Sequence, residues 1–443
     1  MNSGSMNRSS GNYRVLAEAV GRLGNEVLDW RDKSGPPMAD GRSVADLVLA
    51  RTSLAEWGTP LLTLDRGAIA QNVAVMAKWC SARGLELAPH GKTTMAPELF
   101  LAQLRAGAWG ITLANEPQLR VGRAFGLPKI LLAGSFLRPD GLRWLVAQQM
   151  ADPDFRFSSW VDSVRSVELM TSALPAGSNI DVCVELGVDG GRTGARGVGA
   201  ALEVARAVQR SSRLRLIGVS GYEGAVGQGA GADQIGAVDR YLDDIARVWT
   251  AVGPMVDLTT AGRAMITVGG SAYFDRVADR LAEYADPVGK RGPAVEVVLR
   301  SGAYIVHDDG YYRSITPAGR GDGPVLKPAM HAWARVVSHP EPALALLDAG
   351  RRDLPFDQGM PEPQMRRPTD GSPEPLTGAQ IFALNDQHAF LSVRNSDDVE
   401  VGDVVRLGLS HPCTAMDKWT LIPVLDDAAA PDPRVVGMIR TFF

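Results

Sequence analysis

Short runs of apolar and β-branched residues recur along the chain up to residue 300. Most are followed by a segment in which apolar residues return every three or four positions. The short runs lie at 60–64, 86–89, 109–113, 129–133, 155–161, 180–186, 213–219, 264–268 and 295–299. The segments with helical periodicity lie at 66–83, 96–106, 115–124, 139–150, 162–173, 198–209, 232–252 and 273–285. Such alternation predicts βαβ units and a parallel sheet.

The number of strands helps to choose between two parallel architectures. Nine runs have the character of strands; eight would close a (β/α)8 barrel, and one would lie outside it. A doubly wound open sheet is the alternative. The chain has no early glycine-rich G-x-G-x-x-G turn of the kind found in such sheets. The pattern therefore favours an α/β fold built on a (β/α)8 TIM barrel.

The pattern changes after residue 300. Strand-like runs follow at 332–337, 343–348, 380–384, 389–393, 403–409 and 419–425. No convincing helical segment separates them, and residues 354–378 are rich in proline and glycine, as in a long irregular connection. We expect a smaller, mostly antiparallel β domain here. At the other end, helices are expected from Tyr13 to Arg31 and over 44–51, after a polar, frayed start.

Composition narrows the classes of protein that remain. The chain has 443 residues, with 46 Lys and Arg against 50 Asp and Glu, so its formal net charge is −4. That balance excludes a generally basic nucleic-acid binder. No apolar run approaches the roughly 18 residues that span a bilayer, and the start lacks the apolar core of a signal peptide. Cys80, Cys183 and Cys413 form no disulfide framework, so we expect a cytoplasmic protein without nucleic-acid or membrane partners.

The segment LAPHGKTTMAPELF, residues 87–100, holds the first candidate for chemistry. A predicted strand ends at Pro89 and a helix is expected from Pro97, so Lys92 follows the carboxyl end of a strand. Barrels of this type keep their active sites at that face. A desolvated lysine has a lowered pKa and can form a Schiff base with a carbonyl group. A solvated loop lysine is the structural alternative.

Two glycine-rich segments also follow predicted strands. In ELGVDGGRTG, Arg192 projects from a tight turn, although an exposed arginine in a βα loop would look the same. In ITVGGSAYF, a strand runs through Gly269, Gly270 and Ser271 into a helix. The N–H groups at a helix start can bind a phosphate, and barrels often place a phosphate site in the later loops. Short glycine motifs also occur in ordinary loops.

A possible metal pair lies in LGLSHPCTAMDKW near the C-terminal end. His411 and Cys413 are two positions apart, so on extended backbone their side chains point the same way. Imidazole and thiolate suit zinc, and a site with two protein ligands keeps positions open for water or substrate. A buried cysteine and a capping histidine are the alternative. Tyr222 and Tyr304 are further candidates that could equally be half-buried structural residues.

Taken in order along the chain, these motifs resemble the fold-type III pyridoxal-phosphate enzymes, the group of alanine racemase. A lysine in PHGKTT opens the barrel, GVDGGRTG lies in its middle, GGS closes it, and HPCTAMDKW follows in the β domain. Within this group the chain is most similar to the metal-dependent branch of D-serine dehydratases, also called D-serine deaminases, and D-threonine aldolases. The likeness covers residues 55–443.

The resemblance implies a role for each candidate. Lys92 would hold pyridoxal 5'-phosphate as a Schiff base and act as the general base. The cofactor-binding residues would be Lys92, His90, Arg192, Tyr222, Gly269, Gly270, Ser271 and Tyr304. Arg192 would lie near the cofactor phenolate, and the GGS turn would cradle its phosphate. The ligands of Zn²⁺, or of Mn²⁺ or another divalent ion, would be His411 and Cys413.

The resemblance also settles the count of nine strands, because it places the run at 60–64 with the β domain. The chain would then divide into four parts. These are a helical extension at 1–55, a strand and helix leading into the barrel at 56–83, the barrel at 84–300, and the β domain with the metal site at 301–443. Family members are dimers whose site lies between the barrel of one subunit and the β domain of the other. We therefore expect a homodimer.

The expected activity is elimination of water from a 3-hydroxy-D-amino acid, such as D-serine, to give a 2-oxo acid and ammonia. The alternatives are retro-aldol cleavage, as in D-threonine aldolases, and a pyridoxal-phosphate-binding protein without turnover. Aldolases of the branch often carry a second histidine shortly after the lysine, whereas Thr93, Thr94 and Met95 follow Lys92 here. This departure and the cysteine favour dehydration. D-Serine, D-threonine and 3-hydroxyaspartate all fit the chemistry.

Overall fold

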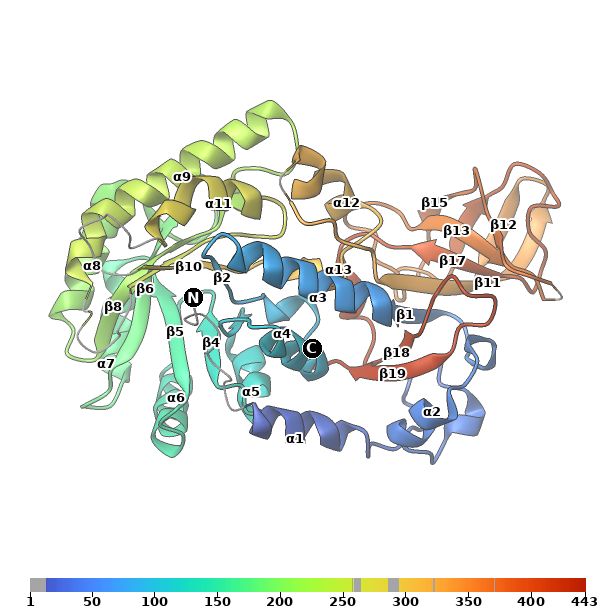
Figure 1. Ribbon diagram of the computed structural model, residues 1–443, viewed down its shortest axis with the longest axis horizontal. Helices are drawn as coiled ribbons and strands as arrows, with labels where there is room; N and C mark the ends of the chain where they lie inside the picture. The colour runs from blue at the N-terminus through green and yellow to red at the C-terminus, as the bar shows by residue number, and fades with distance from the viewer. Residues whose placement is uncertain (1–12, 257, 259–263, 286–294, 322, 370) are drawn as a thin grey trace, which may run out of the picture.

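The computed structural model describes residues 13–256, 258, 264–285, 295–321, 323–369 and 371–443. Its two main bodies are a parallel barrel and a C-terminal sheet (Figure 1). In that view the barrel lies on the left and the C-terminal sheet on the right. The helix α3 (Arg66–Ser81) lies between them.

Among the described residues, eight parallel strands form the barrel. They are β2 (Glu86–Leu87), β3 (Ile111–Leu113), β4 (Lys129–Leu132), β5 (Arg156–Val161), β6 (Ile180–Gly187), β8 (Leu214–Gly221), β9 (Ala264–Thr267) and β10 (Val295–Leu299). They pair in the order β2-β10-β9-β8-β6-β5-β4-β3, and the short β7 (Ala195–Arg196) adds to β6. A parallel bridge between His90 and Thr112 joins the two ends of this path. The predicted barrel is therefore confirmed.

Helices pack around the outside of the barrel, and apolar side chains fill its interior. The helices are α4 (Pro97–Arg105), α5 (Glu116–Ala124), α6 (Pro139–Ala151), α7 (Val164–Ala173), α8 (Gly197–Arg210), α9 (Ala232–Val252) and α11 (Phe274–Leu281). The interior cluster consists of Ala88, Leu131, Trp160, Cys183, Ile217, Met265 and Val298. The strands are buried on both faces, which explains why they appear in the sequence as continuous apolar runs.

The C-terminal sheet includes the strand that precedes the barrel. Its strands are β1 (Leu61–Asp65), β11 (Met330–Glu341), β12 (Leu344–Leu347), β13 (Glu362–Arg367), β14 (Glu374–Pro375), β15 (Gln380–Leu384), β16 (Ala389–Ser392), β17 (Val404–Gly408), β18 (Leu421–Leu425) and β19 (Val435–Arg440). β1 pairs antiparallel with β11 and parallel with β18. The run at 60–64 thus belongs to this sheet, as predicted. A short helix, α12 (Tyr311–Ile315), precedes β11, and another, α13 (Pro412–Met416), separates β17 from β18, where no helix was expected.

Two expectations about this region are wrong. The segment 354–378, expected to be irregular, contains β13 and β14, and β19 is a strand that the pattern does not predict. β13 pairs with β17 although it contains a proline, and the ladder shifts register between Pro363 and Met365. Proline has no N–H to donate to a ladder, so it is tolerated at such an irregularity. The proline content therefore hides a strand.

The N-terminal extension contacts both bodies. Helix α1 (Arg14–Leu23) ends well before Arg31, where the prediction ended it, and α2 (Val44–Ala50) agrees with its prediction. α1 packs against α4, and α2 packs against β19. At the end of β19, Arg440 forms ion pairs with Glu26 at 2.8 Å and with Asp32 at 2.9 Å. None of the described helices has the length and apolar character of a membrane span.

Candidate active site

A cavity of about 240 Å³ lies at the carboxyl ends of the barrel strands. Its walls are formed by His90, Lys92, Ala114, Ala133, Trp160, Glu185, Arg192, Thr193, Tyr222, Gly269, Gly270 and Arg300. The predicted cofactor-binding residues among them are His90, Lys92, Arg192, Tyr222, Gly269 and Gly270. The fold thus brings together residues that are far apart in the sequence, because each follows a different strand of one barrel.

Lys92 lies in a single turn of 3-10 helix, Gly91–Thr93, shortly after β2. The turn is tightly packed: a side chain on Gly91 would come within 2.9 Å of Ile111 and Phe100. No larger residue fits there without displacing its neighbours. This packing fixes the backbone from which Lys92 reaches the cavity.

The surroundings of Lys92 favour its neutral amine. Burial lowers the pKa of Lys92; the charges of Arg192 and Arg300 lower it further, whereas Cys413 acts in the opposite direction. A neutral amine is the form that attacks a carbonyl group or accepts a proton. The site therefore has the electrostatics that the predicted role of Lys92 requires.

Arg192 and Tyr222 form one wall of the cavity. The guanidinium carbon of Arg192 lies 4.3 Å from the centre of the Tyr222 ring, a cation–π contact. Burial raises the pKa of Tyr222 to about 12, so its hydroxyl keeps its proton at neutral pH. Beside them, Thr193 donates a hydrogen bond to Glu185 at 3.0 Å. Glu185 begins the segment ELGVDGGRTG, but only Arg192 of that segment was predicted to be a site residue.

The predicted phosphate turn is held by a buried carboxylate. The backbone N–H groups of Gly269 and Gly270 donate to the two carboxylate oxygens of Glu223, at 3.1 and 2.6 Å. Burial raises the pKa of Glu223, while both hydrogen bonds and the charge of Arg300 lower it. The Ser271 hydroxyl accepts from the backbone N–H groups of the next loop. The two glycine amides therefore bind a protein carboxylate in this structure.

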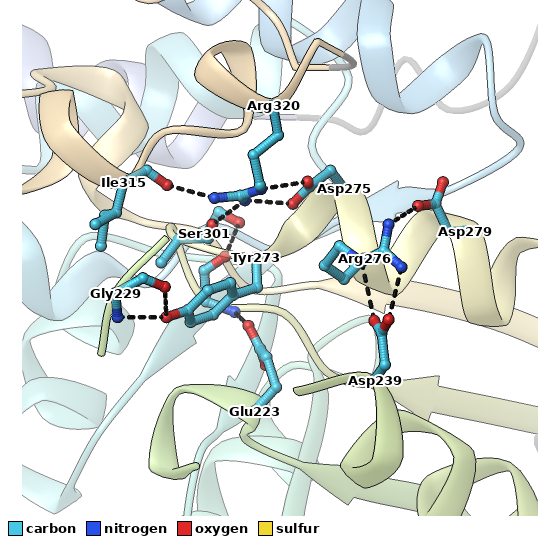
Figure 2. Close-up of polar contacts among 12 residues, drawn as sticks. Glu223, Gly229, Asp239, Tyr273, Asp275, Arg276, Asp279, Ser301, Ile315 and Arg320 are labelled. Atoms are coloured by element: carbon cyan, nitrogen blue, oxygen red, sulfur yellow. Dashed lines mark hydrogen bonds and ion pairs between the residues drawn. The ribbon is translucent and has the colours of Figure 1, made fainter. Parts of the chain in front are cut away.

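Figure 2 shows the polar network behind this turn. The Tyr273 hydroxyl accepts from the N–H of Gly229 at 2.9 Å and donates to its carbonyl at 2.8 Å. Arg320 donates to both carboxylate oxygens of Asp275, at 2.8 and 2.7 Å, and to the Ala272 carbonyl. These contacts hold Ala272, Tyr273 and Asp275, the residues that follow the turn. The turn is a supported structure rather than an open loop.

A smaller recess of about 30 Å³ adjoins the phosphate turn. It is lined by Tyr222, Glu223, Gly224, Gly227, Gly270, Ser271, Ala272, Tyr273, Tyr311 and Tyr312. Ser271 thus lies beside the main cavity, together with two tyrosines that sequence reasoning did not single out.

Tyr304 does not join the other predicted residues. Its ring is buried, and its hydroxyl accepts a hydrogen bond from Gln103 on α4 at 3.1 Å. It lines neither the cavity nor the recess. The structure therefore gives no support to its predicted contact with the cofactor.

Arg300 is a buried cation of the site. Its guanidinium donates to the Thr267 hydroxyl at 2.8 Å and to the Gly221 carbonyl. It also lies 4.7 Å from the centre of the Trp160 ring. Burial lowers its pKa, and the nearby carboxylates, Glu223 first, oppose that effect. It follows β10 directly, a position that would have marked it as a strand-end candidate.

His411 and Cys413 lie together at the start of α13, in what we call the 411–414 turn. His411 has a left-handed backbone with φ of 51°. A hydrogen bond with Cys413 makes the largest contribution to raising the pKa of His411 to about 9, with Asp357 adding to it. The sulfur of Cys413 lies 3.6 Å from the hydroxyl oxygen of Thr93. The predicted metal pair therefore adjoins the turn that carries Lys92.

Several observations indicate that the residues lining the cavity could hold pyridoxal phosphate. Lys92 reaches the cavity, and Arg192 and Arg300 supply positive charge for an anionic group. In the part of the chain that the structure describes, the ring atom Nδ1 of His90 and one oxygen of Glu185 are buried without a hydrogen-bond partner. Buried polar atoms normally have partners, so both point to a polar ligand in the cavity.

His411 and Cys413 do not by themselves complete a metal site. No group of three or more His, Cys, Asp or Glu side chains within the described ranges is arranged to hold a metal ion. His411 and Cys413 would supply two ligands of types that suit zinc, and further positions would belong to water or substrate.

Comparison with known proteins finds similarity to D-amino-acid aldolases and to a dehydratase. Residues 329–425 match the family model "Putative serine dehydratase domain". D-threonine aldolase from Arthrobacter sp. is 27% identical over 386 residues, which cover 86% of this chain and 92% of that protein. D-threo-3-hydroxyaspartate dehydratase from Delftia sp. (strain HT23) is 30% identical over 137 residues, 31% of this chain and 35% of that protein.

Several solved structures share this fold. D-threonine aldolase from Filomicrobium marinum has a TM-score of 0.72 at 25% identity, covering 87% of this chain and 96% of its own. A metal-free cysteine-to-alanine variant of D-threo-3-hydroxyaspartate dehydratase has a TM-score of 0.68 at 20% identity, covering 88% and 99%. Alanine racemase from Clostridium difficile 630, in complex with cycloserine, has a TM-score of 0.57 at 13% identity, covering 83% and 95%.

The fold and the cavity thus define an alanine racemase-like barrel with a lysine at the carboxyl ends of its strands. The predicted resemblance to the fold-type III pyridoxal-phosphate family is confirmed by these comparisons. The relatives are aldolases and a dehydratase, in agreement with the prediction of a lyase.

Proposed function

We propose that this protein is a pyridoxal-phosphate- and metal-dependent lyase that eliminates water from a 3-hydroxy-D-amino acid. D-Serine would yield pyruvate and ammonia. The observation that supports it most directly is the position of His411 and Cys413 next to the Lys92 turn, where Cys413 lies 3.6 Å from Thr93. Proton removal and departure of the hydroxyl would then occur side by side.

Each residue would have a defined task. The amine of Lys92, whose pKa is lowered by burial, would accept the proton from the α-carbon of the substrate. Arg192 and Arg300 would balance negative charge in the cavity. Bound pyridoxal phosphate would spread the charge left on the α-carbon. His411 and Cys413 would hold a divalent ion, which supplies Lewis-acid stabilisation for a departing oxygen.

The pair of ligand types supports dehydration. D-threo-3-hydroxyaspartate dehydratase has been solved as a metal-free cysteine-to-alanine variant and as a variant in which a histidine two positions earlier is replaced by alanine. This chain has the same spacing, with His411 and Cys413. The likeness supports a metal at this pair and a dehydratase activity.

Aldol cleavage is the second candidate. It is favoured by the similarity to D-threonine aldolase, which extends over 386 residues. In that reaction the Cα–Cβ bond would break and the products would be glycine and an aldehyde. The homodimer, its shared site, the cytoplasmic location and zinc as the native metal stay predictions.

A product assay separates these functions. The protein, supplied with pyridoxal phosphate and Zn²⁺, is incubated with D-serine, L-serine, D-threonine or D-threo-3-hydroxyaspartate, and 2-oxo acid, ammonia and glycine are measured. We expect pyruvate from D-serine and none from L-serine. Lys92→Ala should lower turnover by at least about 10²–10⁴-fold, because proton transfer alone contributes that much.

Lys78→Ala is the matched control, since Lys78 is an exposed lysine on α3. It should leave turnover unchanged. Glycine and aldehyde as products would replace the dehydratase by the aldolase. Bound cofactor without turnover of any substrate would instead favour the binding protein.

A further inference from the structure

His411 is held at both its backbone and its imidazole ring. The backbone N–H of His411 donates to the carboxylate of Asp308 at 3.0 Å. Asp308 also accepts from the N–H of Gly310 at 3.1 Å and of Tyr312 at 2.8 Å, so it ties His411 to the start of α12. The ring atom Nδ1 lies 2.5 Å from the carboxylate of Asp357. Both the backbone and the ring of His411 are therefore oriented before any ion binds.

Asp357 is itself held in place by the 411–414 turn. Its second oxygen accepts a hydrogen bond from the Thr414 hydroxyl at 2.7 Å. Thr414 follows Cys413, so the carboxylate contacts the turn on both sides of the cysteine. Asp357 comes from the segment 354–378 and is brought here only by the fold of the C-terminal sheet.

The chemistry of this contact determines which ring nitrogen is available. An ionised carboxylate has no proton to donate, so the hydrogen between Asp357 and His411 belongs to Nδ1. The lone pair of a neutral imidazole is then on Nε2, the atom that faces away from Asp357. A histidine that binds a metal commonly donates its other N–H to a carboxylate, which fixes the ring and makes it a stronger ligand.

We propose that Asp357 is the positioning residue of the metal site: it commits His411 to bind the metal through Nε2, and Thr414 holds Asp357 in register with Cys413. The proposal rests on the proposed function, since it requires a divalent ion at His411 and Cys413. It adds a residue to the site that no sequence motif marks.

A simple surface ion pair is the competing explanation. The side chains of His411 and Asp357 are 23% and 40% exposed, and ion pairs with that exposure contribute little to stability. A purely structural pair would leave metal affinity unchanged when it is broken. A positioning carboxylate would not.

Metal affinity is the decisive measurement. The full-length protein and its variants are titrated with Zn²⁺ in competition with a chromophoric chelator, and the metal-free variants are first shown to be folded by thermal unfolding. Asp357→Ala should weaken Zn²⁺ binding by about 10–100-fold, as expected for loss of an outer-sphere partner. Asp357→Asn, which keeps an acceptor oxygen, and Thr414→Val should each weaken it less.

Asp417→Asn is the matched control. Asp417 lies close enough for the charges of Asp357 and His411 to affect its pKa. It should bind Zn²⁺ as the wild type does. Wild-type affinity in Asp357→Ala would overturn this proposal and leave the proposed function standing. Equal weakening by Asp417→Asn and Asp357→Asn would show a general charge effect and would also overturn it. A wild type that binds no divalent ion would refute the metal in the proposed function, and this proposal with it.

Discussion

The barrel and the 411–414 turn contribute to one site in different ways. Lys92, Arg192 and Arg300 reach the cavity from the ends of three different strands. The metal pair lies within a single turn, held by carboxylates from two other segments. The barrel residues therefore depend on the whole parallel sheet for their positions, whereas the turn depends on a few hydrogen bonds.

The two parts also differ in burial and charge. On the barrel side, the buried cation Arg300 faces the buried carboxylates Glu223 and Glu185, whose charges influence its pKa. The 411–414 turn is half-exposed and has carboxylates close by. Substitutions in the barrel part should therefore cost stability as well as activity, and substitutions in the turn should cost activity with little effect on folding.

The largest effect is expected for Arg300→Met, and an unchanged stability would contradict the difference between the two parts of the site. Removing this side chain leaves the Thr267 hydroxyl and the Gly221 carbonyl without their donor and removes a charge that affects the buried carboxyls Glu223 and Glu185. Each buried polar group left unpaired costs about 1–3 kcal/mol. The free energy of unfolding from urea titration is the measurement. Arg313→Met is the control, because Arg313 pairs with Glu362 at the surface and should cost about 1 kcal/mol or less.

A loss below that of the control for Arg300→Met would mean that the barrel part tolerates uncompensated charge. The same titration on Asp357→Ala should show a change of less than about 1 kcal/mol, since this carboxylate is half-exposed. Comparable losses for both variants would remove the distinction between the two parts.

The elements of the barrel could be predicted because the patterns that specify them lie within short segments of the sequence. A buried parallel strand needs an unbroken apolar run and its helix needs a 3.6-residue period, and both are visible in the sequence. β13 was missed because prolines obscure it, and β19, whose apolar run is interrupted by Gly437, was not among the predicted runs. A pattern-based analysis cannot see that Pro363 falls where the ladder changes register.

The candidate site could be predicted only where residues form motifs. Lys92, Arg192 and the His411–Cys413 pair stand in short segments with characteristic neighbours, and the fold brings them together. Glu223 follows the predicted Tyr222 and Arg300 follows a predicted strand, but neither belongs to a motif with recognised chemistry, and their roles depend on what they contact after folding. Tyr304 was a plausible choice, but its side chain turns to Gln103. The orientation of the Tyr304 side chain is set by tertiary packing.

A second prediction concerns the seam between the barrel and the C-terminal sheet, and its effect should depend on pH. Burial raises the pKa of Glu98, on α4, to about 7. One of its oxygens accepts from the N–H of Arg440 on β19 at 3.0 Å, and the other is buried without a partner in the described structure. The folded state thus binds this proton more tightly than the unfolded state, whose carboxyl has its usual pKa of 4.5.

The difference in pKa determines how the free energy of unfolding changes with pH. The stabilisation is fully present below about pH 4.5 and is lost as the pH rises through 7, with a total of about 2–3 kcal/mol. Between pH 5 and pH 8 the wild type should therefore lose about that much stability relative to Glu98→Gln, which cannot ionise. Chemical unfolding of both proteins at the two pH values is the measurement. A difference that does not change with pH would show that Glu98 titrates normally and that the seam is open to water.

A smaller effect than for Glu98 is expected for Arg440→Met, which tests how the N-terminal extension is joined to the rest. Arg440 pairs with Glu26 and Asp32, and methionine would keep the apolar part of the side chain while removing the charge. The loss should be about 1 kcal/mol, and a double-mutant cycle with Glu26→Gln should give a coupling energy of about 0.5–1 kcal/mol.

The bond from the N–H of Phe442 to the carbonyl of Met95, at 3.0 Å, does not involve the arginine side chain. The turn that carries Lys92 should therefore keep its position in Arg440→Met, and cofactor absorbance and turnover should match the wild type. Strictly additive effects of Arg440→Met and Glu26→Gln would mean that the ion pair does not join the extension to β19. A loss of cofactor absorbance would instead show that the extension helps to position Lys92, so that the barrel part of the site depends on a segment outside the barrel.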